Sequence, residues 1–552
     1  MDGSPWQLYV FRETYRFVGA ARLVEPLLDD VRAGRIADAL VRAGEIESAL
    51  ADAGDPERDQ AARLTDTLAA ALVEGRRDDG RATMGASILA RSLAASGPLR
   101  VVPPESFSYY ALHPADFVER MASPPLDGVR RAAVVGLRSI GTTLSAVVSA
   151  ALRARGGAAE RRTVRPRGEP YARSLHLDGP EAEWVRRHLE DGSDFLVVDE
   201  GPGLSGSTLL AVVDALVGAG VPLDRLTIVC TRQPDPSKLL ARNGPERWRA
   251  LRTAVVRCAP RLPAGFAPMA PGGWRARFLG AHARWPACWP WLERAKALSD
   301  DGRTLLKFEG LGRHGADALA RAALAAEAGF GASVRRASDG RAAYGVLPGT
   351  AACACRLDEA IVDRLADYCA WRAGGAPADA SPSRLEDMAR ENAAVALGVD
   401  VRLALEIERP VVADARMMPH EWIELPSRVL VKTDAASHGD DHLLPGPTDV
   451  AWDLAGAIVE WRMPRAAIAR LVAGYARRSG DRVERRLPAW LLAYALYALA
   501  WTELAAAGVE LADEHERLAR EAEGRRRWLR AAAALGLLGK GAAALAAAGR
   551  PA

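Results

Sequence analysis

The 552-residue chain has few cysteines, few lysines and no long apolar run. Its six cysteines are scattered, and the single Cys353-x-Cys355 pair lacks the second pair that a zinc site needs, so six reduced thiols are expected. The longest apolar run, Leu487 to Trp501, has fifteen residues, fewer than the about 20 that cross a membrane. We expect a buried helix there and no membrane partner.

The chain also lacks a charge excess, since 73 basic side chains oppose 70 acidic ones. A net charge of +3 gives no electrostatic case for nucleic acid, and small-molecule substrates are expected instead. The N-terminus has no basic start followed by an apolar stretch, which predicts a cytoplasmic protein. A homodimer stays an open alternative.

The hydropathy pattern divides the chain into units of α/β class. Residues 1–98 show helical spacing and offer no chemical motif. From 99 to 262, strand-like runs alternate with helical stretches, which predicts a parallel sheet. The runs lie at 100–102, 132–137, 194–200 and 226–230.

A Pro/Gly-rich linker is predicted at 263–273, followed by a second domain over 274–552. This domain begins with a hairpin over 292–310, because Asp301-Gly302 between alternating runs favours a tight turn. We expect a small lobe over 274–350 and a mainly helical lobe over 351–552.

One segment joins a buried strand to a helix through a loop of small residues. Asp199 and Glu200 end the strand, and their carboxylates suit the vicinal hydroxyls of a sugar. Backbone N–H groups and hydroxyls at a helix N-terminus favour a phosphate. The loop residues expected to bind it are Gly203, Ser205, Gly206, Ser207 and Thr208.

This order of features resembles the type I phosphoribosyltransferases, over about residues 99 to 260. The resemblance implies phosphoribosyl pyrophosphate as substrate, Mg²⁺, and transfer to a base-like acceptor, with Asp199 and Glu200 as catalytic acids. It also implies a mobile lid over 161–173 that brings Arg165, Arg167 and Arg173 onto the pyrophosphate. The turn expected to bind pyrophosphate contains Arg138, Ser139, Gly141 and Thr142. Gly203-Leu204 departs from the two hydroxylated residues that many members have.

Lysine is rare enough here, five of the 73 basic residues, that Lys307 between apolar neighbours on a predicted strand is informative. A strand lysine paired with a helix glutamate, here Glu327, holds ATP phosphates in protein-kinase-like folds. Leu347 lies where a strand runs into Pro348-Gly349, which is typical of a hinge between lobes.

Asp414 and Asp434 follow with a short hairpin between them, and the stretch 275 to about 525 resembles the aminoglycoside phosphotransferase (choline-kinase-like) family. The resemblance implies a bilobal fold that uses ATP and Mg²⁺ to phosphorylate a small alcohol. Asp414 would be the base, Asp434 the magnesium ligand and Asp453 a support of the catalytic loop. The family's asparagine ligand is missing, with Pro419 and His420 near its place.

Two alternatives stay open. His438-Gly-Asp-Asp-His442 supplies four potential metal ligands in five residues, which also suits a metallohydrolase centre. Both domains could instead bind nucleotides without turnover, as a regulator does. Trp490, Tyr494, Tyr497 and Trp501 recur at helical spacing, which predicts core packing. The preferred hypothesis is a bifunctional enzyme that transfers phosphoribosyl and phosphoryl groups in the synthesis of a nucleoside-like metabolite.

Overall fold

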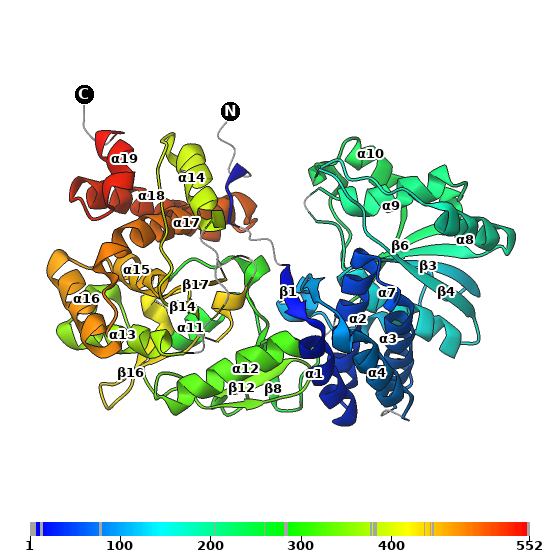
Figure 1. The fold of residues 1–552 in the computed structure, drawn as a ribbon, viewed down its shortest axis with the longest axis horizontal. Helices are drawn as coiled ribbons and strands as arrows, with labels where there is room; N and C mark the ends of the chain where they lie inside the picture. The colour runs from blue at the N-terminus through cyan, green and yellow to red at the C-terminus, as the bar shows by residue number, and fades with distance from the viewer. Residues whose placement is uncertain are drawn as a thin grey trace.

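The computed structural model describes residues 7–10, 15–76, 80–169, 171–203, 205–258, 260–280, 285–375, 378, 383–434, 436–441, 443 and 446–548. The chain forms two halves that meet along helix α12 (Figure 1). One half contains residues from about 16 to 256 and the other contains most of the rest.

A five-stranded parallel sheet forms the centre of the first half, as the strand-like runs predict. Its order is β4-β3-β5-β6-β7, and every neighbouring pair is parallel. The central strands are almost continuously apolar because helices cover both faces. The strands are β3 (Arg131–Leu137), β4 (Ala158–Val164), β5 (Asp194–Val198), β6 (Leu226–Cys230) and β7 (Arg252–Val255).

Helices on the two faces of this sheet build two separate cores. On one face, α7 (Ile140–Ala154) packs with the N-terminal helices in one apolar cluster. On the other face, α8 (Gly179–Glu190) and α9 (Ser207–Gly218) pack with α10 (Gly244–Arg249). The N-terminal helices are α1 (Ala20–Arg32), α2 (Ile36–Ala53), α3 (Arg58–Val73) and α4 (Arg81–Ser92).

Residues 100–102 do not join the parallel sheet, contrary to the prediction. Strand β2 (Pro98–Val101) instead pairs antiparallel with β1 (Arg16–Gly19). Two short helices, α5 (Glu105–Ser108) and α6 (Asp116–Arg120), then lead into β3. Runs of four residues carry too little pattern to show which neighbour a strand will find.

The second half begins with a five-stranded antiparallel sheet of order β11-β12-β10-β9-β8. The predicted hairpin is confirmed, with Leu305 opposite Leu298. The predicted linker is wrong in part, because β8 (Phe266–Met269) pairs with β9 inside this sheet. The other strands are β9 (Lys296–Ser299), β10 (Thr304–Phe308), β11 (Val334–Arg336) and β12 (Arg341–Gly345), with α11 (Trp274–Phe278) before β9 and α12 (Gly312–Glu327) after β10.

A mainly helical lobe follows, as predicted. Its core helix is α17 (Leu487–Gly508), which is long and apolar enough to cross a membrane but has most of its length buried in the lobe. Around it lie α13 (Glu359–Ala373), α14 (Ser383–Leu397), α15 (Ala451–Glu460), α16 (Arg465–Ser479), α18 (Ala512–Ala534) and α19 (Ala543–Ala548). Short strands frame the loops, namely β13 (Thr350–Ala351), β14 (Pro410–Val412), β15 (Trp422–Glu424), β16 (Leu430–Lys432) and β17 (Pro447–Asp449).

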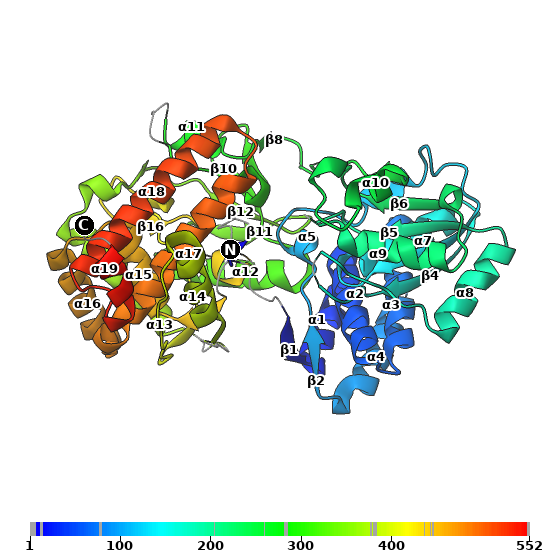
Figure 2. The same cartoon turned by 90° about the horizontal axis from the view of Figure 1, so that it is seen from above.

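Polar contacts join the two halves. Arg313 at the start of α12 pairs with Glu45 of α2 at 2.9 Å, and the Gly312 N–H donates to Asp38 at 2.7 Å. The view from above in Figure 2 shows α12 extending toward α1 and α2. The N-terminal segment crosses between the halves, since Leu8 and Val10 are buried in the core of the helical lobe and residues from Ala20 onward in the other half.

The cysteines differ from expectation at one place. Cys353 and Cys355 form a disulfide, while Cys230, Cys258, Cys288 and Cys369 are free. A separation of two residues brings the two Cα atoms to 5.2 Å, within the range that a disulfide bridges.

Candidate functional site

The principal cavity of the second half has a volume of about 300 Å³ and lies between the antiparallel sheet and the helical lobe. It is the size of a small ligand pocket. Lys307, Leu347 and Asp434 line it. So do Tyr494, Tyr497 and Trp501 of α17, with Trp289 against Trp501, and these four side chains form its aromatic end. The cavity therefore joins the residues predicted to bind ATP to aromatic residues that the sequence assigned to the core.

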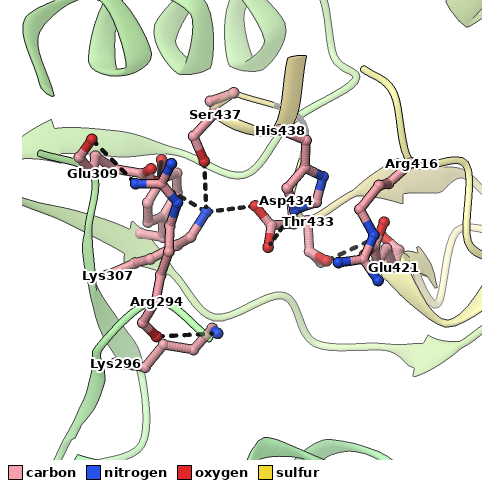
Figure 3. A network of polar contacts seen from close by, with 12 residues as sticks. Arg294, Lys296, Lys307, Glu309, Arg416, Glu421, Thr433, Asp434, Ser437 and His438 are labelled. Atoms are coloured by element: carbon pink, nitrogen blue, oxygen red, sulfur yellow. Dashed lines mark hydrogen bonds and ion pairs between the residues drawn. The ribbon is translucent and has the colours of Figure 1, made fainter. Parts of the chain in front are cut away.

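Lys307 lies at the centre of a polar network (Figure 3). Its side chain is 5% exposed, and Nζ lies 2.5 Å from Asp434 Oδ1, 3.2 Å from Glu309 Oε1 and 3.2 Å from Ser437 Oγ. Burial lowers the pKa of this lysine, but Asp434 and Glu309 outweigh it and raise the pKa overall. The lysine is thus a well-paired cation that links the two lobes.

The predicted pairing of Lys307 with Glu327 is wrong. Glu327 is the exposed last residue of α12, while Glu309 follows Lys307 by two positions, directly after the end of β10, and lies 3.2 Å from it. Alternate residues of a strand share a face, so a local carboxylate takes the place that a helix residue was expected to fill. Tyr344 holds Glu309 from the neighbouring strand at 2.6 Å.

Asp414 lies behind the cavity wall with 0% exposure. Its carboxylate accepts from Tyr368 Oη at 2.6 Å and lies 3.4 Å from Lys432 Nζ. Burial would raise its pKa, but Lys432 above all keeps that pKa low. In this conformation the predicted base is ionised but does not line the cavity.

Hydrogen bonds from the backbone of the loop to Asp453 fix the start of the loop at Asp414, as the resemblance implies. Asp453 Oδ2 and Oδ1 accept the N–H groups of Asp414 and Ala415, each at 2.9 Å. Ala415 has a φ of 66°, a left-handed conformation that turns the chain sharply. Arg416 and His420 consequently line the cavity although Asp414 does not.

Few side chains of the cavity could coordinate Mg²⁺. Asp434 Oδ1 is bound to Lys307, and Oδ2 lies 3.3 Å from His438 Nε2. His420 stacks on Trp274, with ring centroids 5.4 Å apart, and burial lowers its pKa to about 4. The described residues contain no group of three or more acids, histidines or cysteines placed to hold a metal. The side chains present therefore do not fit a resident Mg²⁺. The metallohydrolase alternative gains no support from the described residues, which do not include His442.

A second candidate site lies at the point of the parallel sheet where the chain reverses the direction in which it adds strands. The chain runs from β3 outward to β4 and then crosses back to β5, so the switch point lies between β3 and β5. Ligands of such sheets bind outside the carboxyl ends of the strands at that point. Both predicted motifs, the turn after Leu137 and the loop after Val198, begin there.

The acids of the second motif are half-buried. Burial and the neighbouring Glu200 raise the pKa of Asp199 well above its usual value. Ser106 of α5 donates to the Glu200 carboxylate. Beyond them, Gly206 takes a left-handed conformation (φ 66°) as the cap of α9, and the hydroxyls of Ser205 and Ser207 lie 2.9 Å apart. Gly203 is exposed and Thr208 half-buried, while Leu204 lies outside the described residues.

Side chains of helix α2 contact the turn that was predicted to bind pyrophosphate. Asp52 lies 3.1 Å from Arg138 and 2.6 Å from Arg165, and Ser48 accepts the Ser139 N–H at 3.2 Å. Thr142 is fully buried with its hydroxyl 2.9 Å from that of Ser48. The prediction that the Thr142 side chain faces a ligand is wrong, because α2 packs on α7 at this point.

Gly141 also serves the protein itself. A Cβ there would lie 2.4 Å from the carbonyl oxygen of Val198, and its N–H donates to Asp199. The glycine therefore permits α7 to approach β5. Two arginine nitrogens nearby can still donate hydrogen bonds, since Arg138 Nε and Arg165 Nη2 are buried without a hydrogen bond in the described structure. These atoms fit an additional anionic group.

The predicted lid is shorter than expected. Residues 161–164 belong to β4, and the Arg161 side chain is buried against Glu47 and Asp66. Only the following turn projects, where Arg167 pairs through its backbone with Ser174. Arg167 and Arg173 are exposed there. The prolines on which the prediction rested affect the turn but not the strand before it.

Arg232 is a site residue that the sequence analysis missed. It follows β6, and its side chain lies against Gly201 and contacts the Pro202 carbonyl, with Trp291 of the other half 4.6 Å away. A basic residue directly after a buried strand is the signal that would have revealed it.

No family model and no curated protein matches the sequence. Solved structures with a similar chain trace include the choline kinase LicA from Streptococcus pneumoniae, with 13% identity and a TM-score of 0.30 over 42% of this chain and 89% of that one. Another is a choline/ethanolamine kinase family protein from Mesorhizobium loti, with 15% identity and a TM-score of 0.32 over 46% and 89%. A third is the macrolide 2'-phosphotransferase MphH from Brachybacterium faecium, with 16% identity and a TM-score of 0.30 over 47% and 92%. We argue function from the side chains and not from these distant similarities.

Proposed function

We propose that the second half binds ATP, with Mg²⁺ arriving as part of the nucleotide substrate, and phosphorylates a small alcohol. The observation that carries this proposal is the meeting of Lys307 from the sheet with Asp434 from the helical lobe at 2.5 Å, in the lining of a cavity of about 300 Å³. A lysine and a carboxylate placed across two lobes are what phosphoryl transfer requires to hold the nucleotide.

In the proposed reaction the acceptor oxygen forms a bond to the γ-phosphorus, the bond from that phosphorus to the bridging oxygen breaks, and ADP leaves. The hydroxyl proton passes to Asp414. Because Asp414 is fully buried, the 414–421 loop must rearrange before this step.

We propose for the first half the transfer of a phosphoribosyl group from phosphoribosyl pyrophosphate to a base-like acceptor. The support is the position of Asp199, Glu200 and the α9 loop at the topological switch point, with two under-bonded arginines beside them. Replacing both acids, Asp199→Asn with Glu200→Gln, should abolish binding of phosphoribosyl pyrophosphate in calorimetry while the protein stays folded. Unchanged affinity would contradict this assignment.

A nucleotide-sensing regulator is the second candidate, and one observation favours it. Asp414 is closed off by Tyr368 and Lys432, and Asp434 is already neutralised by Lys307 and His438. The two candidates differ in turnover. Purified protein with ATP, Mg²⁺ and a panel of small alcohols should release ADP if the kinase proposal is right. Saturable ATP binding without ADP release would favour the regulator, and no ATP binding at millimolar nucleotide would contradict both.

A further inference from the structure

We propose that the acceptor bound in the cavity of the second half carries an anionic group, a carboxylate or a phosphate, and that Arg416 binds it. The inference rests on the proposed phosphoryl transfer and names the class of its acceptor. It rests on the partners of the charged side chains that line the cavity, among them Asp441, which lies 3.7 Å from Arg294.

Every carboxylate at the aromatic end of the cavity already has a basic partner. Glu460 and Glu521 both bind Arg525, at 2.8 and 2.7 Å. Glu421 binds Lys432 at 2.8 Å. A cationic acceptor would find no unpaired carboxylate among these residues, although the aromatic rings alone would suit it.

The basic side chains of the cavity are likewise paired, but one of them only weakly. Lys307 binds Asp434, and Lys296 binds Glu293 at 2.9 Å. Arg294 donates to the Ser108 carbonyl at 3.1 Å. Arg416 is the most weakly held of these cations, because within the described part of the chain its guanidinium makes no hydrogen bond and its ion pair with Glu421 spans 4.0 Å.

The nearest carboxylate to Arg416 is Glu421, whose Oε1 is 4.0 Å from Nε and whose other oxygen binds Lys432. The guanidinium lies over Trp501 at 5.5 Å, and the side chain is 35% exposed to the cavity. An arginine offers five donors in a planar fork that matches carboxylate and phosphate. These donors are available to a ligand.

The position of Arg416 assigns it to the acceptor and not to ATP. Figure 3 shows Arg416 on the opposite side of Asp434 from Lys307. Its electrostatic neighbours besides Glu421 and Asp434 are Tyr494 and Tyr497, both at the aromatic end. An anionic group held there would place the remainder of the acceptor between Arg416 and the point of transfer beside Asp434.

Calorimetry with three small alcohols of different charge tests this inference, in the presence of a non-hydrolysable ATP analogue. Glycerate is the anionic probe, glycerol the neutral one and choline the cationic one, and glycerol 3-phosphate supplies a phosphate. We expect the two anionic probes to bind at least tenfold more tightly than glycerol or choline. Arg416→Gln should remove that difference and leave the affinity for the ATP analogue within twofold.

Arg390→Gln is the matched control, because this arginine is exposed on α14 and does not line the cavity. Arg416→Lys should retain part of the preference, since it keeps the charge and loses the fork. Tighter binding of choline than of glycerate, or equal binding of glycerate by wild type and Arg416→Gln, would overturn the inference. So would a large loss of affinity for the ATP analogue in Arg416→Gln, which would assign the arginine to the γ-phosphate. Failure of the wild type to bind the analogue at all would count against the proposed function itself.

Discussion

At the scale of single residues, Lys307 shows how a rare residue type marks a site while its surroundings stay hidden. The sequence suggested a lysine in an apolar strand, whose removal would cost little stability. The structure gives it two carboxylate partners, Glu309 and Asp434. Removing one member of a buried ion pair leaves an uncompensated charge, so the loss of Lys307 should instead destabilise the fold.

We therefore expect Lys307→Met to abolish ATP binding and also to lower the free energy of unfolding by about 3 kcal/mol, the order found when a buried pair loses one partner. Urea denaturation and a nucleotide titration measure the two effects. Lys540→Met, an exposed lysine on the surface, is the control. An unfolding midpoint equal to that of the wild type would show that Lys307 is not paired as described.

His113 gives a pH dependence at the contact between the halves. It is buried, with Nε2 3.5 Å from Asp339 of the second half, and burial lowers its pKa to about 4. The unfolded chain has a histidine pKa of about 6.5, so it binds the proton first as the pH falls. Stability from the neutral histidine is thus complete above about pH 6.5 and is lost as the pH falls toward 4.

We expect His113→Gln to flatten the decline in stability between pH 6.5 and 4, measured by urea denaturation at several pH values. The exposed His515 provides the matched control, His515→Gln. The buried His314 contributes equally to wild type and variant, so it cancels in the comparison. Parallel pH curves for wild type and His113→Gln would contradict the prediction.

At the scale of elements, β4 and the turn after it divide the basic segment that the sequence treated as one lid. Arg161 lies on β4 and is buried against two carboxylates, whereas Arg167 and Arg173 are exposed in the turn. Sequence alone could not separate them, because alternating arginines suit a mobile loop and a strand that packs on charged helices equally well.

Trypsin should therefore cut after Arg167 or Arg173 and leave Arg161 and Arg162 intact under native conditions. If the turn closes over pyrophosphate, millimolar pyrophosphate should slow this cleavage several-fold, as followed by mass spectrometry of the fragments. Sulfate at equal ionic strength is the control. Early cleavage after Arg161 would show that β4 is not formed, and rates independent of pyrophosphate would exclude the turn as a lid.

Helix α2 is the element least visible in advance. The sequence showed only helical spacing there, yet Arg42, Glu45 and Glu47 are all buried in ion pairs. The helix is covered on several sides by α3, α7 and α12, so its polar residues meet partners from distant parts of the chain. Those partners, and the placement of Asp52 at the switch-point site, follow only from the packing.

At the scale of the whole molecule, α5 connects the two candidate sites. Ser106 donates to Glu200 of the first site, while Phe107 and Ser108 accept from the Leu311 N–H at 2.8 Å and from Arg294 at 3.1 Å. Arg294 lines the cavity of the second site. A ligand that moves Arg294 therefore acts on the same short helix from which Ser106 contacts Glu200.

We expect the two sites to be coupled, so that a saturating ATP analogue changes the affinity for pyrophosphate by about fivefold or more, and pyrophosphate changes the affinity for the analogue by the same factor. Cross-titrations in a calorimeter measure both factors. Ser106→Ala should bring the factor toward one, and Ser123→Ala, on an exposed turn, should not. Identical affinities with and without the other ligand would show that the sites are independent.

The sequence by itself determined the local parts of this protein. The parallel strands, the 292–310 hairpin, the buried helix at 487 and the loops around Asp199 and Asp434 each depend on spacing within a few dozen residues. Tertiary structure alone decided which groups meet across the chain. Asp434 pairs with Lys307, α2 supplies Asp52 to the switch-point arginines, and Leu8 joins the helical lobe. The physical reason is that ion pairing and burial depend on distance in space, and two residues far apart in the sequence leave no periodic pattern to show that they touch.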